Sequence, residues 1–331
     1  MQISDAMMDG QLRTTGVWLR RMGSRHSERR LRVISGVIDG LLWLARARRP
    51  KTLRVGEFGI DRGDGTRLRV VVYSPLASTT AAAGLLWLHG GGYFLGRPEQ
   101  DLRIYRLLAE RTGCVVVAPD YRLSVAHPYP AALDDCYTAL IWMRDNAIRL
   151  GIREDQLAVA GESAGGGLTA ALALLARDRE EVNIAFQMPI YPMIDDRQST
   201  ESACDNDAPL LDSDTLASAW QLYLRNLDGT QRVPVYAAPA RAGDLRGLPP
   251  TFTYVGGLEP FRDETIAYVD ALRSCGVSVD FEIYPGCWHG FDRLVPRAEV
   301  SKRAFRSRER WLRHALDTYF APQPGANRDR A

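Results

Sequence analysis

The chain alternates apolar segments of strand length with segments of helical periodicity over most of its 331 residues. Short apolar runs, such as GLLWLH at 84–89 and CVVVAPD at 114–120, are typical of buried strands, and 130–151 has helical spacing. Two earlier runs, 53–60 and 67–74, predict strands joined by the turn DRGDG. Strands that alternate with helices predict an α/β fold, with a mostly parallel central sheet and helices on both faces.

Two regions interrupt this alternation, and we interpret both as parts of a helical cap. They divide the chain into an N-terminal part of the cap (1–50), core (51–194), a cap insertion (195–226), core (227–321) and a tail (322–331). The tail is rich in Pro, Gly and charge, which predicts disorder.

The N-terminal 50 residues are strongly basic, with ten arginines against four acidic residues. Five apolar residues recur there at helical spacing: Leu31, Ile34, Ile38, Leu41 and Leu42. We expect arginines to fill the other face of this helix. The pattern favours an amphipathic segment that packs on the protein over one that contacts a membrane surface.

Composition excludes several classes of function. The net charge is only +2 and no basic segment is interleaved with aromatics, so nucleic acid is not an expected partner. The five cysteines are scattered without metal or redox spacing, so we expect no metal site. We expect no signal peptide at the start of the chain, and the first long apolar stretch, 33–45, is too short to span a bilayer. These features predict a cytoplasmic location.

The segment VAGESAGGG at 158–166 contains the pattern G-x-S-x-G, centred on Ser163. This pattern places a serine on a sharp turn between a strand and a helix, where glycines two residues before and after prevent a Cβ clash. An apolar strand precedes the pattern and a helical run follows it, which makes Ser163 the predicted nucleophile. A serine hydroxyl needs a base to accept its proton.

We assign the base to His289. In this kind of site the order along the chain is serine, acid, histidine. His26, His89 and His127 precede the serine, and His314 lies on an arginine-rich helical face, whereas His289 follows a predicted strand in a glycine-flanked loop.

The acid must follow the strand at 251–256, where Glu259, Asp263 and Glu264 are candidates. Glu259 lies just beyond the strand end, as orientation of the histidine requires. Asp263 and Glu264 fall inside the next helix, where acidic residues commonly stabilise the N-terminus. We choose Glu259; whether Asp263 shares the role stays open.

Three consecutive glycines follow His89 in LLWLHGGGYFLG at 85–96. Attack on a carbonyl places negative charge on its oxygen, and preorganised N–H groups stabilise that charge. We expect the Ala164 N–H and this glycine loop to supply them, with His89 organising the loop. A phosphate-binding loop is the rival interpretation, but its sequence patterns are absent.

Together these motifs resemble the hormone-sensitive-lipase-like branch of the α/β-hydrolase superfamily, the bacterial carboxylesterases and arylesterases. The matching segments are HGGGY, APDYRLSVAHPYPAALDD, GESAGG, LEPFRDE and WHGF. The resemblance implies an α/β-hydrolase fold with a cap, oxyanion donors at Gly91, Gly92 and Ala164, and a triad of Ser163, Glu259 and His289. The chain departs from the usual pattern at 124–126, at Glu162 and at Glu259, the last two standing where Asp is commoner.

The expected activity is cofactor-free hydrolysis of short-chain acyl or aryl esters through an acyl-enzyme. Tyr93, Phe94 and Trp220 are candidate substrate-binding residues. Trp18, Trp43 and Trp220 are candidate walls of the acyl pocket, although each is interpreted as core more readily than as a pocket wall. Amide or lactone hydrolysis, a ligand-binding receptor and a peripheral membrane lipase are the alternatives. The sequence does not settle the natural ester, the acyl-length limit or whether the chain forms a homodimer.

Overall fold

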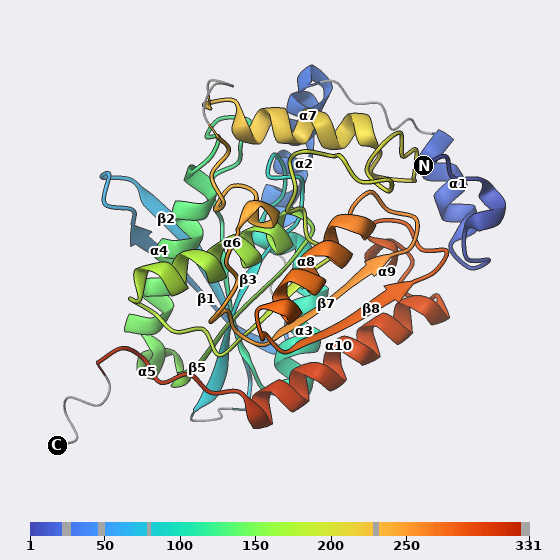
Figure 1. The fold of residues 1–331 in the computed structure, drawn as a ribbon. Coiled ribbons are helices and arrows are strands. Elements are labelled where there is room, and N and C mark those ends of the chain that lie inside the picture. The colour runs from blue at the N-terminus through green and yellow to red at the C-terminus, as the bar shows by residue number, and fades with distance from the viewer. Residues whose placement is uncertain (22–27, 46–49, 78–80, 228–231, 326–331) are drawn as a thin grey trace.

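The computed structural model describes residues 1–21, 28–45, 50–77, 81–227 and 232–325, which build one eight-stranded sheet with helices around it (Figure 1). The strand order is β1-β2-β4-β3-β5-β6-β7-β8. The β1–β2 and β2–β4 pairs are antiparallel and the other five pairs are parallel, so the predicted mostly parallel sheet is confirmed. The strands are β1 Leu53–Asp61, β2 Arg67–Pro75, β3 Ala82–Leu88, β4 Val115–Pro119, β5 Ile152–Glu162, β6 Phe186–Ile190, β7 Thr251–Gly256 and β8 Val279–Tyr284.

The helix predicted over 130–151 is divided in two, because Asn146 leaves helical geometry and its side chain bonds the carbonyl of Trp142. Short 3₁₀ turns lie at Asp5–Met7, Pro98–Asp101 and Pro239–Arg241. The α-helices are α1 Arg13–Arg21, α2 Glu28–Ala45, α3 Leu102–Thr112, α4 Ala131–Asp145, α5 Ala147–Leu150, α6 Ala164–Arg179, α7 Ser213–Leu224, α8 Arg262–Ser274, α9 Phe291–Leu294 and α10 Glu299–Thr318.

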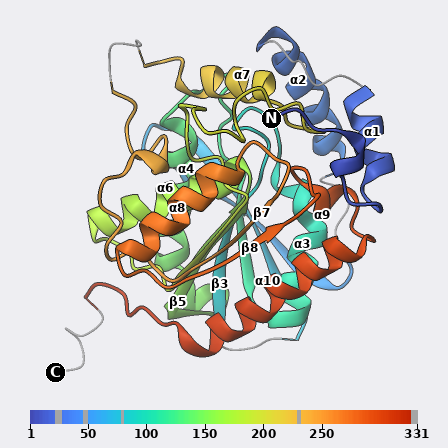
Figure 2. The same cartoon turned by 45° about the vertical axis from the view of Figure 1, so that its right-hand side comes forward.

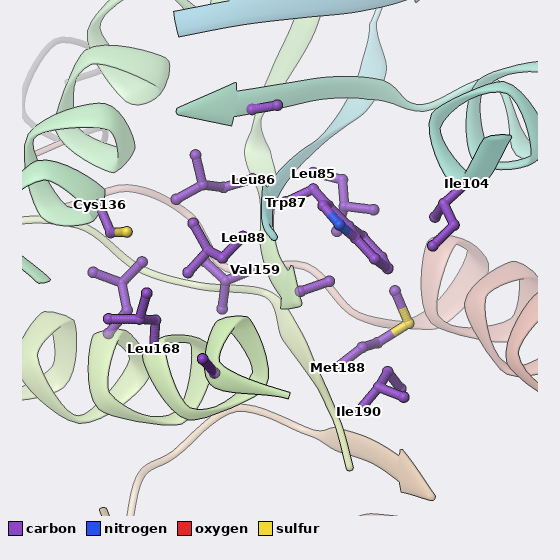
Figure 3. Packing of buried hydrophobic residues seen from close by; sticks show 14 of the residues in the cluster. Leu85, Leu86, Trp87, Leu88, Ile104, Cys136, Val159, Leu168, Met188 and Ile190 are labelled. Carbon is purple, nitrogen blue, oxygen red and sulfur yellow. The ribbon is translucent and has the colours of Figure 1, made fainter. Parts of the chain in front are cut away.

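Helices cover both faces of the sheet, as the alternation predicts. α4, α6 and α8 pack on one face, and α3 and α10 pack on the other (Figures 1 and 2). Successive residues of β3 point to opposite faces: Leu86 and Leu88 lie toward α4 and α6, whereas Leu85 and Trp87 lie toward α3 (Figure 3). The central strands are therefore buried on both sides and form a rigid platform for the loops at their ends.

The two segments that the sequence predicts to be a cap meet at the loop that follows β3. α2 lies against α7. Ser35 of α2 donates to the carbonyl of Phe94 over 2.6 Å, and a Cβ added at Gly92 would lie 3.5 Å from Ala219 of α7. Residues far apart in the sequence thus converge on one loop.

The outer face of α2 differs from the prediction. Leu31 and Ser35 are buried. Leu41 is 62% exposed, so the prediction that Leu41 lies on the packed face is wrong. The exposed side carries Arg29, Arg30 and Arg32 in the first turns, as predicted. Further along it is apolar, because this helix has more apolar residues than one face can hold: Val33, Val37, Trp43 and Leu44 are all more than half exposed.

Trp18 and Trp43 are 57% and 56% exposed, so interpreting them as core is wrong. Their helices cover the molecule from outside, and both rings lie on the solvent side. Among the described residues, no helix has the length and apolar character needed to cross a membrane.

The C-terminal segment follows α10 back to the edge of the core. The side chain of Asn183 donates to the carbonyl of Pro322, and Gln323 bonds the backbone of Asn183. The expected disorder therefore does not begin at residue 322, and residues 326–331 lie outside the described part of the chain.

Candidate active site

Three side chains from distant parts of the sequence converge at the carboxyl ends of parallel strands. Ser163 follows β5, Glu259 follows β7 and His289 follows β8. His289 Nε2 lies 2.8 Å from Ser163 Oγ, and His289 Nδ1 forms a hydrogen bond with Glu259 Oε2. One imidazole therefore links the predicted nucleophile to the predicted acid.

Ser163 is held in a strained backbone conformation, with φ 59° and ψ −121°. The turn closes only because its flanking residues lack side chains: a Cβ on Gly161 would lie 2.4 Å from the carbonyl oxygen of Gly165. A Cβ on Gly165 would lie 2.0 Å from the carbonyl oxygen of Leu88. A side chain at either glycine would therefore clash, as the sequence motif predicts. The strained turn aims the Ser163 hydroxyl out of the sheet.

The candidate acids occupy three different environments. Glu259 is fully buried, and its second oxygen, Oε1, accepts a hydrogen bond of 2.6 Å from the N–H of Gly256. Asp263 instead accepts from the N–H of Ser202 and pairs with Arg262. Glu264 accepts from the N–H of Ile194, and burial raises its pKa well above the ordinary value. Only Glu259 bonds the imidazole.

The His289 ring is also fixed by packing. Tyr191 and Phe261 both contact it edge-on, with centroid distances of 4.9 and 5.1 Å. Sequence reasoning missed both aromatics, because they follow β6 and β7 and meet only in the folded chain. With the carboxylate of Glu259, they hold the imidazole toward Ser163.

The glycine loop after β3 packs directly on the nucleophile turn. A Cβ on Gly90 would lie 2.9 Å from the carbonyl oxygen of Glu162, and Gly91 and Gly92 have φ of 129° and 58°, which favour glycine. Within the described residues, the N–H groups of Gly91, Gly92 and Ala164 have no hydrogen-bond acceptor. They are thus free to bind a negatively charged oxygen.

His89 organises this loop. Its Nδ1 lies 2.9 Å from the carbonyl oxygen of Gly90, and its ring stacks on Tyr121 at 4.1 Å. The Tyr121 hydroxyl donates to the His89 carbonyl over 2.6 Å. Burial lowers the pKa of His89 to about 4, so the ring is neutral at pH 7 and Nδ1 donates to Gly90.

A buried network of charges supports the nucleophile turn from behind. Glu162, which precedes Ser163, accepts from Arg308 over 2.9 Å and from Arg293 over 3.2 Å. Arg293 also pairs with Asp101 at 2.6 Å. The sequence offered only the unusual Glu162 as a signal, since its partners lie more than 120 residues later.

The three predicted substrate-binding aromatics lie close to the loop but are themselves well buried. The Tyr93 hydroxyl donates to the carbonyl of Met193 over 2.8 Å, and its ring stacks on Tyr223 at 3.9 Å. Phe94 is 6% exposed and Trp220 is 3% exposed. Tyr93 therefore joins the glycine loop to α7, and contact of any of the three with substrate stays a prediction.

Fold and site together define a serine hydrolase built on a capped, mostly parallel sheet. The chain belongs to the α/β-hydrolase family: residues 85–293 match the family described as the alpha/beta hydrolase fold. The resemblance to its hormone-sensitive-lipase-like branch is confirmed by relatives that are carboxylesterases and arylesterases.

The chain is 36% identical to the carboxylesterase NlhH of Mycobacterium tuberculosis, over 81% of this chain and 88% of that protein. It is 34% identical to an arylesterase of Saccharolobus solfataricus, over 63% of this chain and 68% of the other. Among solved structures, a bacterial heroin esterase superposes with a TM-score of 0.85 at 32% identity, covering 95% of this chain and 99% of its own.

Proposed function

We propose that the chain is a carboxylesterase that cleaves short-chain acyl or aryl esters through an acyl-enzyme, with Ser163, His289 and Glu259 as its triad. The observation that carries this proposal is the continuous chain from Ser163 Oγ through the imidazole to the buried Glu259. The carboxylesterase, arylesterase and heroin esterase relatives support an ester substrate.

The first half of the reaction acylates Ser163. Its Oγ attacks the ester carbonyl while His289 Nε2, 2.8 Å away, accepts the hydroxyl proton. Glu259 holds Nδ1 as the donor and stabilises the imidazolium. The carbonyl oxygen becomes negative and accepts from the N–H groups of Gly91, Gly92 and Ala164, each worth about 3 kcal/mol of barrier.

Collapse of this intermediate breaks the bond to the leaving alcohol, which takes the proton from His289 Nε2. A water molecule then enters, and the imidazole accepts its proton as the water oxygen attacks the acyl carbonyl. The second tetrahedral intermediate expels Ser163 Oγ, which recovers the proton from His289. The products are one carboxylic acid and one alcohol, and the enzyme returns to its starting state.

The test is turnover of p-nitrophenyl esters with acyl chains of two to twelve carbons, beside p-nitroacetanilide as the matched amide. We expect the acetate and butyrate esters to give the highest kcat/KM and the anilide to react at least about 10³-fold more slowly. Ser163→Ala should abolish ester turnover in folded protein. Faster cleavage of the anilide would favour the amidase alternative, and a folded but inactive wild type would favour a binding protein.

The peripheral membrane lipase is the second candidate, and the apolar outer face of α2 favours it. Val33, Val37 and Leu44 lie on that face with more than 60% of each side chain exposed, next to an arginine-rich segment. Co-sedimentation with anionic vesicles that is lost in Val37→Glu would support this function, and no binding by the wild type would remove it. The cytoplasmic location stays a prediction, and homodimer formation stays an open alternative.

A further inference from the structure

A cavity of about 410 Å³ lies between α3 and α10, helices that pack side by side on the same face of the sheet (Figure 2). Its volume is within the range of small-molecule sites, roughly 300–1,000 Å³. None of Ser163, Glu259 and His289 lines it. The cavity is therefore separate from the candidate active site, and ligand binding there does not depend on ester hydrolysis.

The lining is strongly cationic. One carboxylate, Glu309, faces six basic side chains: Arg103, Arg111, Arg297, Lys302, Arg306 and Arg308. Four of these six form ion pairs with glutamates at 2.6 to 3.9 Å. Arg103 and Arg297 form no ion pair with any residue that the structure describes, so positive charge is left over at the cavity.

The cavity also has an apolar side. Leu107, Leu108 and Leu312 line it, and the ring of Phe305 lies beneath the guanidinium of Arg103 at 5.4 Å. Leu108 and Leu312 are themselves buried, whereas Leu107 and Phe305 are partly exposed. Apolar surface gains about 25 cal/mol per Å² when an occupant covers it. An occupant with an alkyl part would cover it.

Charge and apolar surface are separated along α10. Lys302 and Leu312 are ten residues apart, which corresponds to about 15 Å along a helix. Arg297 precedes α10 and Lys302 lies in its first turn, whereas Arg306 lies about two turns into the helix. The cation nearer the apolar end, Arg111, is neutralised by Glu309 at 2.7 Å. The cavity thus has a basic end and an apolar end.

We propose that this cavity binds an amphiphile with one anionic head and a single alkyl chain, the chemistry of a medium-chain fatty carboxylate. The head group pairs with Arg103 and Arg297, which pair with no carboxylate in the described part of the chain. The alkyl chain lies along Leu107, at the end of the cavity where Leu108 and Leu312 are buried. A cationic amphiphile would meet repulsion from the basic end, and a short carboxylate would leave the apolar end uncovered.

Isothermal titration calorimetry of the full chain with decanoate tests this proposal. The variants are Arg103→Gln/Arg297→Gln at the basic end and Leu107→Gln at the apolar end. Arg106→Gln is the matched control, since Arg106 lies one turn from Arg103, pairs with Glu110 and does not line the cavity. Butyrate keeps the head without the tail, and decyltrimethylammonium keeps the tail with the opposite charge.

We expect decanoate to bind the wild type and Arg106→Gln alike. The Kd of decanoate should rise about tenfold in the double arginine variant, equivalent to about 1.4 kcal/mol. It should also rise in Leu107→Gln. Butyrate and decyltrimethylammonium should show no binding at the same concentrations. The proposal is overturned if decanoate does not bind, if the double variant and Leu107→Gln both bind it like wild type, or if decyltrimethylammonium binds equally well.

Discussion

Arg308 Nη1 donates to Glu162 Oε1 over 2.9 Å, so a residue of the last helix holds the residue that precedes the nucleophile. The two side chains are 3% and 0% exposed. Removing one partner of a buried ion pair typically costs about 3–5 kcal/mol, and here Glu162 would keep only Arg293, at 3.2 Å. We therefore expect Arg308→Met to lower the free energy of unfolding by about 3 kcal/mol.

Urea denaturation checks this expectation, and the double variant Glu162→Gln/Arg308→Met is its control. Because the double variant removes both charges, it should be more stable than Arg308→Met alone. If the stability losses of Glu162→Gln and Arg308→Met, measured separately, add up to the loss in the double variant, the ion pair contributes nothing to the stability of the nucleophile turn.

The acid assignment is tested by comparing Glu259→Gln with Asp263→Asn. Loss of the carboxylate that fixes the histidine tautomer costs about 10⁴-fold in kcat in a related triad, and we expect a similar loss for Glu259→Gln. Asp263 contacts Ser202 and Arg262 rather than His289, so Asp263→Asn should change kcat/KM by less than about tenfold, or about 1.4 kcal/mol. Steady-state kinetics on p-nitrophenyl acetate would reveal the opposite order if Asp263 were the acid.

The glycine loop is tested by Gly91→Ala. A Cβ there would lie 2.0 Å from the carbonyl oxygen of Leu95 at a φ of 129°, so the loop must shift and its N–H groups with it. We expect kcat to fall by about 10²–10³-fold, the cost of losing one oxyanion donor. Gly113→Ala is the control, since Gly113 also has positive φ but open space around it. Equal activity in the two variants would argue against an oxyanion role for this loop.

His89 should make the fold sensitive to acid. Its pKa is lowered to about 4 by burial, whereas an unfolded histidine titrates near 6.5. Because the unfolded chain binds the His89 proton more tightly than the folded chain does, the contribution of His89 to stability is complete above about pH 6.5. That contribution falls as the pH drops toward 4, by about 3 kcal/mol in all.

Urea denaturation of wild type and His89→Asn between pH 7 and 4 isolates that contribution. The wild type should lose about 3 kcal/mol more than the variant over this range. Parallel loss in the two proteins would mean that His89 takes up no proton on unfolding.

The sheet and the order of the site residues could be predicted because their signals are local. A short apolar run predicts its strand, and G-x-S-x-G constrains one turn whatever surrounds it. The choice of Glu259 rested on its distance from a strand end, which is also a local property. In each case the deciding residues lie within a few positions of one another.

The remaining features depend on tertiary contacts. The partners of Glu162 and the aromatics around His289 come from other elements, and no spacing rule connects them in the sequence. The error on Leu41 has a similar cause: periodicity finds an apolar face, but α2 has two, and only packing against α7 and the glycine loop selects which one is buried.

The most direct test of the central claim is the intact mass of the protein after reaction with diethyl p-nitrophenyl phosphate. We predict that one phosphoryl group is added per chain on Ser163, that one p-nitrophenolate is released, and that esterase activity is lost in proportion. The Ser163→Ala protein should gain no mass. Modification of another residue, or full activity in a protein carrying the Ser163 adduct, would contradict the account.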